Sequence, residues 1–449
     1  MIHNQRTERV GRNLIKQNYS IFTIEDLQHY IRTATLAALS AFLILLSGCE
    51  DPGGVGSRFL DEDAGLETIT TPLASSEAVT VDSYSGGLRY MAIGRYDDPV
   101  FGQFESIGIL KPSIDTTSIG SQISEEDLFQ LRLTFSSTHY GDTTQTARYE
   151  LYRLSDIWRG NELYFTDQLE MDQSELVGEF EVSGETTVSV DLAQSWIDEY
   201  NEFLSSSNED RQEQYRTGFP GLAIVPADGT TRAHFIRVRP DPGDDAEDEE
   251  LARFVRVPAE DLEEWEEWDG TDEEDPRQFL PLADWGAFGE WGEPAERDEK
   301  SIYLTNPLES VLRVETGLSE SVPGGRNVSN AQLIFHPNRE LLELPDGHVR
   351  PEVTELRLHR VNSARVGEWI FGRDPVLTAS LNQGNDSFRF DLTGYINEIL
   401  FNAPPPGQFY LSAHTVTGLV FSTVLHGEDA DDDTLRPKLI ITSVNSDSR

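Results

Sequence analysis

Reactive side chains are sparse in this sequence, and their spacing limits the chemistry they can support. Cys49 is the only cysteine, which excludes an internal disulfide. The nine histidines are scattered, and those at 336, 359, 414 and 426 do not stand at zinc-ligand spacing. The sequence contains no Gly-x-Ser-x-Gly nucleophile elbow, no His-Glu-x-x-His motif and no phosphate-binding loop. We therefore expect a protein that is not an enzyme, with no catalytic residues and no metal ligands.

The chemistry that Cys49 supports is lipid attachment. Residues 34–46 form an apolar run that is too short to span a bilayer, which takes about 20 residues, but suits a signal peptide. Leu46, Ser47, Gly48 and Cys49 then match the lipobox of bacterial lipoprotein precursors, in which the thiol receives lipid and the chain is cleaved before the cysteine. We predict a signal peptide over residues 1–48 and a lipid anchor on Cys49. The polar lead is long, so translation is expected to begin nearer residue 27 or 31.

Two acidic residues, Glu50 and Asp51, follow the cysteine directly. They resemble the surface-export signal of some outer-membrane lipoproteins. The expected location is the outer membrane, with the folded part exposed at the cell surface. The alternative is a lipoprotein that faces the periplasm, with an incidental acidic pair.

The charge of the chain excludes some partners. There are 80 acidic and 35 basic residues, a net charge of -45, and this disfavours nucleic acid and anionic membrane surfaces. Lysine occurs only at positions 16, 111, 300 and 438. High acidity with little lysine resembles proteins of salt-loving bacteria, because concentrated salt screens the self-repulsion of such a chain.

Alternating apolar and polar residues dominate the chain after the expected tether at residues 49–64. The runs at 131–135, 149–154 and 188–192 have the period of two that is typical of half-buried antiparallel strands. An all-β fold of two tandem antiparallel β-sandwiches, jelly-roll-like and with short helices, is expected. The predicted domains are residues 65–240 and 301–449, joined by an acidic linker or insertion at 241–300.

The second half repeats the first in sequence pattern. Residues 131–135, 151–154 and 188–192 correspond to residues 331–335, 358–361 and 388–392 in the same order. A short helix is predicted after the last strand of each set, over 192–203 and 393–401. In the first helix, Leu192, Trp196, Ile197 and Tyr200 fall on one face and predict its buried side.

Ligand contacts are hardest to place from the sequence. Trp265 and Trp268 lie in an acidic stretch and are the preferred candidates for an exposed contact, such as sugar stacking. The acidic run at residues 241–250 lacks the spacing of a defined Ca²⁺ loop. No cofactor is expected. The alternative is Ca²⁺ bound by the carboxylates of this acidic run.

Two stretches resemble known families of secreted proteins. The closing Arg436-Pro437-Lys438-Leu439-Ile440-Ile441 resembles the final strand of DNRLRE-type β-sandwich domains. Residues 94–102, Gly-Arg-Tyr-Asp-Asp-Pro-Val-Phe-Gly, resemble a stretch in an uncharacterised family of outer-membrane lipoproteins. Asp before Pro and Gly after Phe in this stretch favour a tight turn with a buried Phe101. The resemblances imply a fold and a location but bring no catalytic residues.

The predicted function is that of a non-catalytic cell-envelope lipoprotein that binds a glycan or serves as an accessory envelope component. A structural or adhesive protein that binds a protein partner is the alternative. A glycoside hydrolase is a further alternative, because paired carboxylates are too common here to single out a catalytic pair. The expected partners are the membrane, through the lipid on Cys49, and a polysaccharide or an envelope protein.

Overall fold

The computed structural model describes twelve stretches of the chain. They are residues 66–114, 122–204, 211–240, 251–267, 277–292, 297–307, 309–316, 327–360, 376–381, 386–401, 408–413 and 417–444. The predicted signal peptide, lipobox (Leu46, Ser47, Gly48), Cys49, Glu50 and Asp51 lie outside these residues, as do Trp268 and the acidic run at 241–250. Within the described stretches, no helix is long and apolar enough to cross a membrane.

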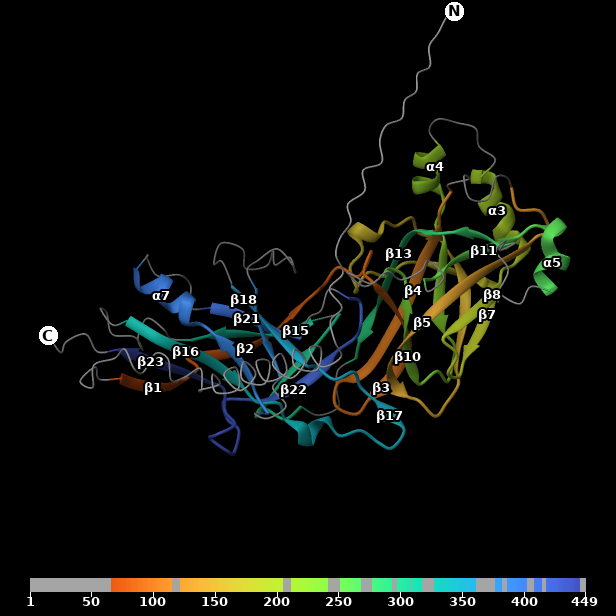
Figure 1. Ribbon diagram of the computed structural model, residues 1–449. Helices are drawn as coiled ribbons and strands as arrows, with labels where there is room; N and C mark the ends of the chain where they lie inside the picture. The colour runs from red at the N-terminus through yellow and green to blue at the C-terminus, as the bar shows by residue number, and fades with distance from the viewer. Residues whose placement is uncertain are drawn as a thin grey trace, which may run out of the picture. The chain divides into compact units, whose positions relative to one another are not determined.

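The protein is mostly β-structure, as the alternating patterns predicted (Figure 1). The strands of the first part are β1 (Leu66–Pro72), β2 (Ser75–Val81), β3 (Tyr90–Asp98), β4 (Gly102–Pro112), β5 (Leu128–Asp142), β6 (Ala147–Leu154), β7 (Met171–Val182), β8 (Thr187–Asp191), β9 (Leu222–Pro226), β10 (Arg232–Arg237), β11 (Arg253–Val257), β12 (Gln278–Leu280) and β13 (Leu282–Trp291). Those that follow are β14 (Ser301–Thr305), β15 (Glu309–Glu315), β16 (Asn327–Phe335), β17 (His348–Val349), β18 (Glu355–Arg360), β19 (Val376–Ser380), β20 (Phe388–Asp391), β21 (Gln408–Ser412), β22 (Ser422–His426) and β23 (Lys438–Val444).

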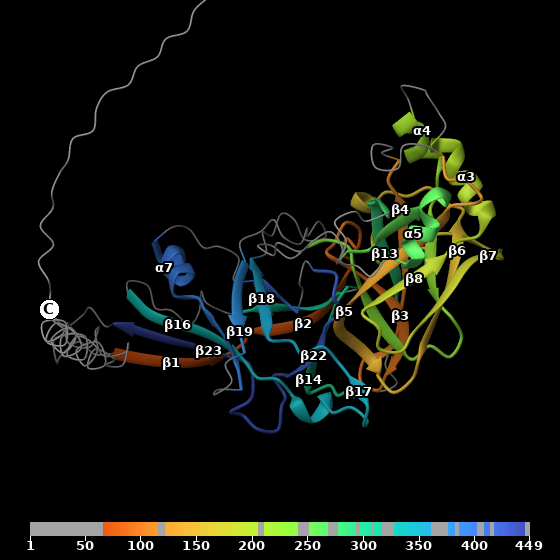
Figure 2. The same cartoon turned by 45° about the vertical axis from the view of Figure 1, so that its right-hand side comes forward.

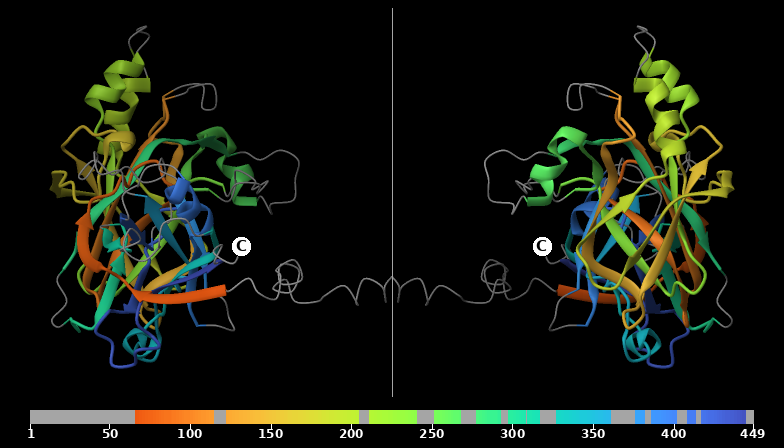
Figure 3. Two further views of the ribbon diagram at one scale, coloured as in Figure 1. Left: turned by 90° about the vertical axis from the view of Figure 1, so that its left-hand side faces the viewer. Right: turned by 90° about the vertical axis from the view of Figure 1, so that its right-hand side faces the viewer.

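The helices of the described residues are short. They are α3 (Gln194–Leu204), α4 (Arg211–Gly218), α5 (Leu262–Glu267), α7 (Thr393–Phe401) and the 3-10 turns η1 (Gly160–Glu162), η3 (Ala259–Asp261) and η4 (Arg339–Leu342). Helices α3 and α4 lie side by side at one end of the neighbouring strands (Figure 3). Trp196, Ile197 and Tyr200 of α3 are buried, which confirms the predicted apolar face.

All the strand ladders are antiparallel, and they form two sets. The first is a 12-stranded curled sheet with the order β12-β11-β5-β10-β3-β4-β9-β6-β7, to which β13 adds on β4 while β8 and β17 add on β5. The second set consists of a 4-stranded sheet, β1-β23-β16-β20, and a 7-stranded sheet, β19-β18-β21-β15-β14-β22, with β2 added on β15. Helix α7 packs on β16 of the second set (Figure 2).

The two sets share one strand order. The row β12-β11-β5-β8 matches β1-β23-β16-β20, and the row β7-β6-β9-β4-β3-β10 matches β19-β18-β21-β15-β14-β22. The first set differs because β10 also pairs with β5, and this ladder joins its two rows into one curled sheet. The repeat seen in the sequence is thus also a repeat of strand pairing.

Strand register refines the equivalence drawn from the sequence. Gln130 faces Asp191 in the first set, and Gln332 faces Asp391 in the second. Residue 130 is therefore equivalent to residue 332, two positions later than the sequence pattern suggested. The shift is invisible in the sequence because a displacement by two keeps the same side chains on the same face.

Strand pairing also cuts across the predicted domain limits. Strands β1 and β2, placed by the sequence in the first domain, pair with β23 and β15 of the second set. Residues 241–300, predicted as an acidic linker or insertion, contribute β11, β12 and β13 to the first set. Acidic composition masked these strands, whose inward residues, such as Phe254 and Phe288, are buried.

A buried histidine lies in the core of the first set. His234 is 1% exposed, its Nδ1 lies 2.7 Å from the Tyr149 hydroxyl, and its Nε2 has no hydrogen-bond partner in the described structure. Burial, together with the charges of the nearby Arg232 and His139, lowers the pKa of His234 to about 3. Folding therefore keeps this imidazole neutral.

We predict that His234 makes the fold sensitive to acid. The unfolded chain binds a proton near the ordinary histidine pKa of about 6.5, so the stabilisation is complete above that pH and is lost as the pH falls toward 3. Between pH 7 and 5.5, the free energy of unfolding should fall less steeply for His234→Gln than for the unchanged protein. The two slopes should differ by at most about 1.4 kcal/mol per pH unit. Urea unfolding of both proteins tests this, and equal slopes would contradict it.

Candidate functional site: a pocket lined by tryptophans

A hollow of about 510 Å³ opens beside the last residues of β4 and the first residues of β13. We call it the tryptophan pocket. Its wall also includes residues next to η1 and residues of α4. It is lined by Gly86, Gly87, Lys111, Ser113, Ile114, Trp158, Arg159, Asn161, Gln212, Tyr215, Arg216, Arg239, Ala283, Asp284 and Trp285.

Close backbone packing forms one wall of the tryptophan pocket. A Cβ atom on Gly86 would lie 2.0 Å from the carbonyl oxygen of Gly160, so only glycine fits there. The amide of Gly160 donates to both carboxylate oxygens of Asp284, at 3.0 and 2.9 Å. These contacts fix the start of β13 against η1.

Lys111 is the buried cation of the pocket. It is 3% exposed, its Nζ donates to the carbonyl oxygen of Trp158 at 3.0 Å, and it lies 4.8 Å from the centre of the Trp158 ring. Burial lowers the pKa of Lys111 to about 8, against the opposing attraction of Asp284. Its ammonium therefore gives up a proton more readily than an exposed lysine does.

Asp284 is the acidic counterpart of Lys111. Burial raises the pKa of Asp284, while the Gly160 amide and the charge of Lys111 act in the opposite direction. No direct ion pair joins Lys111 and Asp284 in the described part of the chain, so they interact through space. The pocket thus holds one buried base and one partly buried acid at a distance from each other.

The two tryptophans are fixed by hydrogen bonds of their indole groups. Trp158 Nε1 donates to the Pro220 carbonyl at 2.8 Å, and Trp285 Nε1 donates to the Leu88 carbonyl at 2.7 Å. The guanidinium of Arg239 lies 4.9 Å from the centre of the Trp285 ring. Because their polar edges are satisfied, the rings are held rigidly in the wall of the hollow, with Trp158 buried and Trp285 half-buried.

The preferred sequence candidates lie elsewhere. Trp265 belongs to α5, is partly buried, and has the guanidinium of Arg277 5.2 Å from the centre of its ring. It does not line the tryptophan pocket, and Trp268 is outside the described residues. The sequence signal for the pocket was Lys111, because lysine occurs at only four positions in a chain whose other basic residues are arginines.

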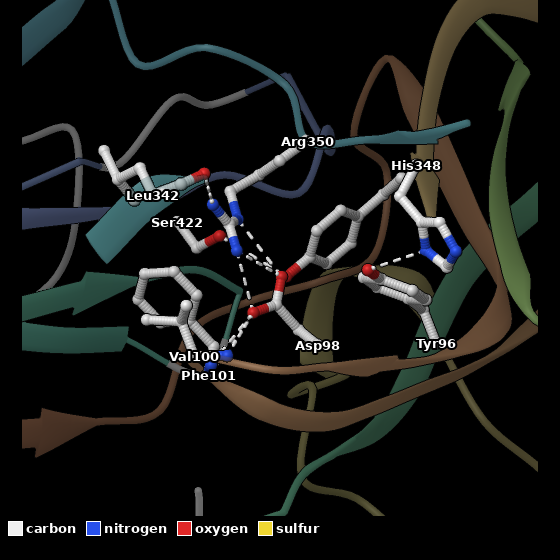
Figure 4. A network of polar contacts seen from close by, with 9 residues as sticks. Tyr96, Asp98, Val100, Phe101, Leu342, His348, Arg350 and Ser422 are labelled. Atoms are coloured by element: carbon white, nitrogen blue, oxygen red, sulfur yellow. Dashed lines mark hydrogen bonds and ion pairs between the residues drawn. The ribbon is translucent and has the colours of Figure 1, made fainter. Parts of the chain in front are cut away.

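The motif at residues 94–102 forms a structural junction (Figure 4). The Asp98 carboxylate accepts the amides of Val100 and Phe101 at 2.8 and 3.0 Å and the Tyr140 hydroxyl at 2.7 Å. Arg350 donates to the same carboxylate at 2.8 Å, and the two side chains are only 6% and 0% exposed. Arg350 lies after β17, so this pair ties the turn after β3 to a distant part of the chain.

Neighbouring residues strengthen this junction. Tyr96 Oη lies 3.1 Å from His348 Nδ1 (Figure 4), and Phe101 is buried with its ring edge-on to Tyr303. Burial, together with the negative charge of Asp98, raises the pKa of Tyr140 well above its ordinary value. The predicted tight turn with a buried Phe101 is confirmed.

Carboxylates gather at a second hollow, of about 750 Å³, near the start of β14. Asp298 accepts the Lys300 amide and the Ser301 hydroxyl, and Asp431 accepts Lys300 Nζ at 2.6 Å. Among the described residues, no cluster of three or more His, Cys, Asp or Glu side chains is arranged to hold a metal ion. These carboxylates therefore have structural partners.

We predict that Asp98→Asn is strongly destabilising, because it leaves the buried Arg350 charge without its carboxylate. The free energy of unfolding should fall by about 3–5 kcal/mol in urea unfolding. Asp97→Asn is the matched control, since Asp97 is the exposed neighbour on the same strand. A loss no larger than that of the control would contradict the assigned role.

Selective labelling tests the state of Lys111, since the chain has only four lysines. In protein labelled with ¹³C-lysine, the Cε resonance of Lys111 should titrate near pH 8. Lys300 is the control, because its hydrogen bond to Asp431 raises its pKa. Titration of Lys111 above pH 10 would show that its burial is not as described.

No protein-family model, curated protein or solved structure matches the chain. The resemblances of residues 94–102 and 436–441 to secreted families therefore stay predictions.

Proposed function

We propose that this protein is a non-catalytic, lipid-anchored envelope protein that binds a glycan in the tryptophan pocket. In this proposal the anchor is on Cys49, the protein faces outward from the outer membrane, and the chain builds two tandem β-sandwiches after its signal peptide. The repeated strand order supports the two sandwiches. The lipobox supports the anchor.

The observation that carries the binding role is the pairing of fixed aromatic faces with convergent polar groups. Trp158 and Trp285 border a hollow of about 510 Å³, within the size range of small-ligand sites. Sugars present apolar C–H faces and a rim of hydroxyls. The indole rings suit stacking on the C–H faces, and the side chains of Asn161, Gln212 and Asp284 suit hydrogen bonds to the hydroxyls.

An aromatic pair beside the pocket extends the surface for a longer glycan. Tyr84 and Tyr164 stack with ring centres 4.3 Å apart and are 41% and 36% exposed. An isolated antiparallel bridge between Tyr84 and Tyr164, with a hydrogen bond from the Ser85 amide to the Leu163 carbonyl, joins their segments. Tyr84 is two residues from Gly86 in the pocket wall, which suits a chain of sugars that continues past the pocket.

Binding is favoured over hydrolysis by the composition of the wall. Glycoside hydrolysis by the common routes uses two carboxylates about 5–9.5 Å apart. The described lining of the tryptophan pocket contains a single carboxylate, that of Asp284. The Asp284 carboxylate as acceptor and the Lys111 ammonium as donor suit hydrogen bonding to hydroxyl groups.

A glycan array probed with the complete chain in detergent, at low and high salt, tests the proposal. Trp285→Ala should weaken binding of any captured glycan at least tenfold, which corresponds to about 1.4 kcal/mol. Trp265→Ala is the control, because Trp265 is a tryptophan outside the pocket. Circular dichroism checks that both variants fold. Failure of the folded protein to bind any glycan, or equal losses in both variants, would overturn the proposal.

A further inference from the structure

We infer that the ligand of the tryptophan pocket is an acidic sugar, a uronate whose carboxylate is held by Lys111 and the surrounding arginines. This inference rests on the proposed glycan binding and names the class of sugar. It comes from the charge of the wall, which is opposite to that of the protein.

The pocket is a cationic spot on a strongly acidic chain. The whole chain carries 80 acidic and 35 basic residues. Yet the wall contains Lys111, Arg159, Arg216 and Arg239 against the one carboxylate of Asp284. A wall with this excess of positive charge attracts an anion.

Internal partners leave much of this charge available. Arg159 and Arg216 contact Glu162 and Glu213 at 3.8 and 3.7 Å, in pairs whose side chains are 39–66% exposed. Exposed pairs of this kind contribute about 0–1 kcal/mol, so a ligand can displace them at little cost. The Arg239 guanidinium lies over the Trp285 ring at an exposed position, and its five N–H donors suit a carboxylate.

Lys111 supplies the second argument. Its buried ammonium has three N–H donors, and the described hydrogen bond to the Trp158 carbonyl uses one. Asp284 attracts this charge only through space and Trp158 offers a ring face, and burial still lowers the Lys111 pKa, so the ammonium is incompletely compensated for the loss of water. A carboxylate entering the pocket would add a direct countercharge, and arginine forks beside it suit the two oxygens of a carboxylate.

The surrounding negative charge sets a condition on such a ligand. Charges elsewhere on the protein repel an acidic glycan at long range, but the screening length falls from about 10 Å at 0.1 M salt to about 3 Å at 1 M. Contacts inside a partly enclosed pocket are screened less. Association with an acidic glycan should therefore persist at molar salt.

Calorimetry with the complete chain in detergent tests the inference. The probes are trisaccharides of galacturonate, glucuronate and mannuronate, each as the free acid and as the methyl ester, which keeps the shape and removes the charge. At least one free acid should bind ten times more tightly than its ester or more, at 0.1 and at 1 M salt. Sulfated trisaccharides form a separate arm.

Variants assign the effect to the pocket. Lys111→Met keeps an apolar stem and should reduce the preference for acid over ester at least tenfold. Arg239→Gln, at an exposed position, should reduce it in the same direction and serves if Lys111→Met does not fold. Lys300→Met is the control, since Lys300 lies at the other hollow.

The outcomes separate this inference from the proposed function. Equal affinity for acids and esters overturns the acidic ligand while glycan binding stands, and a preference for sulfated sugars overturns the carboxylate. A preference for free acids that survives both pocket variants removes Lys111 and Arg239 as its cause. If neither these probes nor the array yields binding, the proposed function fails as well.

Discussion

The buried ion pair between Asp98 and Arg350 is the contact on which the remaining organisation depends. Both charges are removed from water, at 0% and 6% side-chain exposure, and the carboxylate is satisfied by two backbone amides and the Tyr140 hydroxyl as well. Such a pair adds little stability over an apolar replacement, but breaking it is costly because one charge remains buried alone. The pair therefore specifies that β3 and the segment after β17 lie together, and it contributes little to the net stability of either segment.

Exchange of strands reinforces the same connection. Strands β1 and β2 precede the first set in sequence but pair in the second, on β23 and β15. In the other direction, β17 follows β16 of the second set in sequence but pairs with β5 of the first. An uncovered strand edge is a site for unwanted pairing, and this arrangement protects those edges from within the chain.

The tryptophan pocket depends on the pairing of β13 with β4. Asp284 and Trp285 belong to β13, which reaches Lys111 because it pairs antiparallel with β4. The η1 segment meets the same strand through Gly160. Residues 111, 158 and 284 are far apart in sequence, so their meeting is a product of the ladders. The cations gathered there give an acidic protein one place suited to an acidic ligand.

The sequence by itself determined the strands at residues 131–135, 149–154 and 188–192, the helix face of Trp196, Ile197 and Tyr200, the turn with Phe101 and the repeated pattern, because alternation, helical spacing and turn residues are local signals. Strand partners were decided only by the tertiary structure, since alternation identifies a buried face without identifying the neighbour. Acidic composition obscured β11, β12 and β13, and only the pairing of β13 with β4 brings Trp285 rather than Trp265 to the pocket. Lys111 was visible as a rare lysine, but only the tertiary structure buried it against Trp158, which lowers its pKa, and placed it near Asp284 in a site.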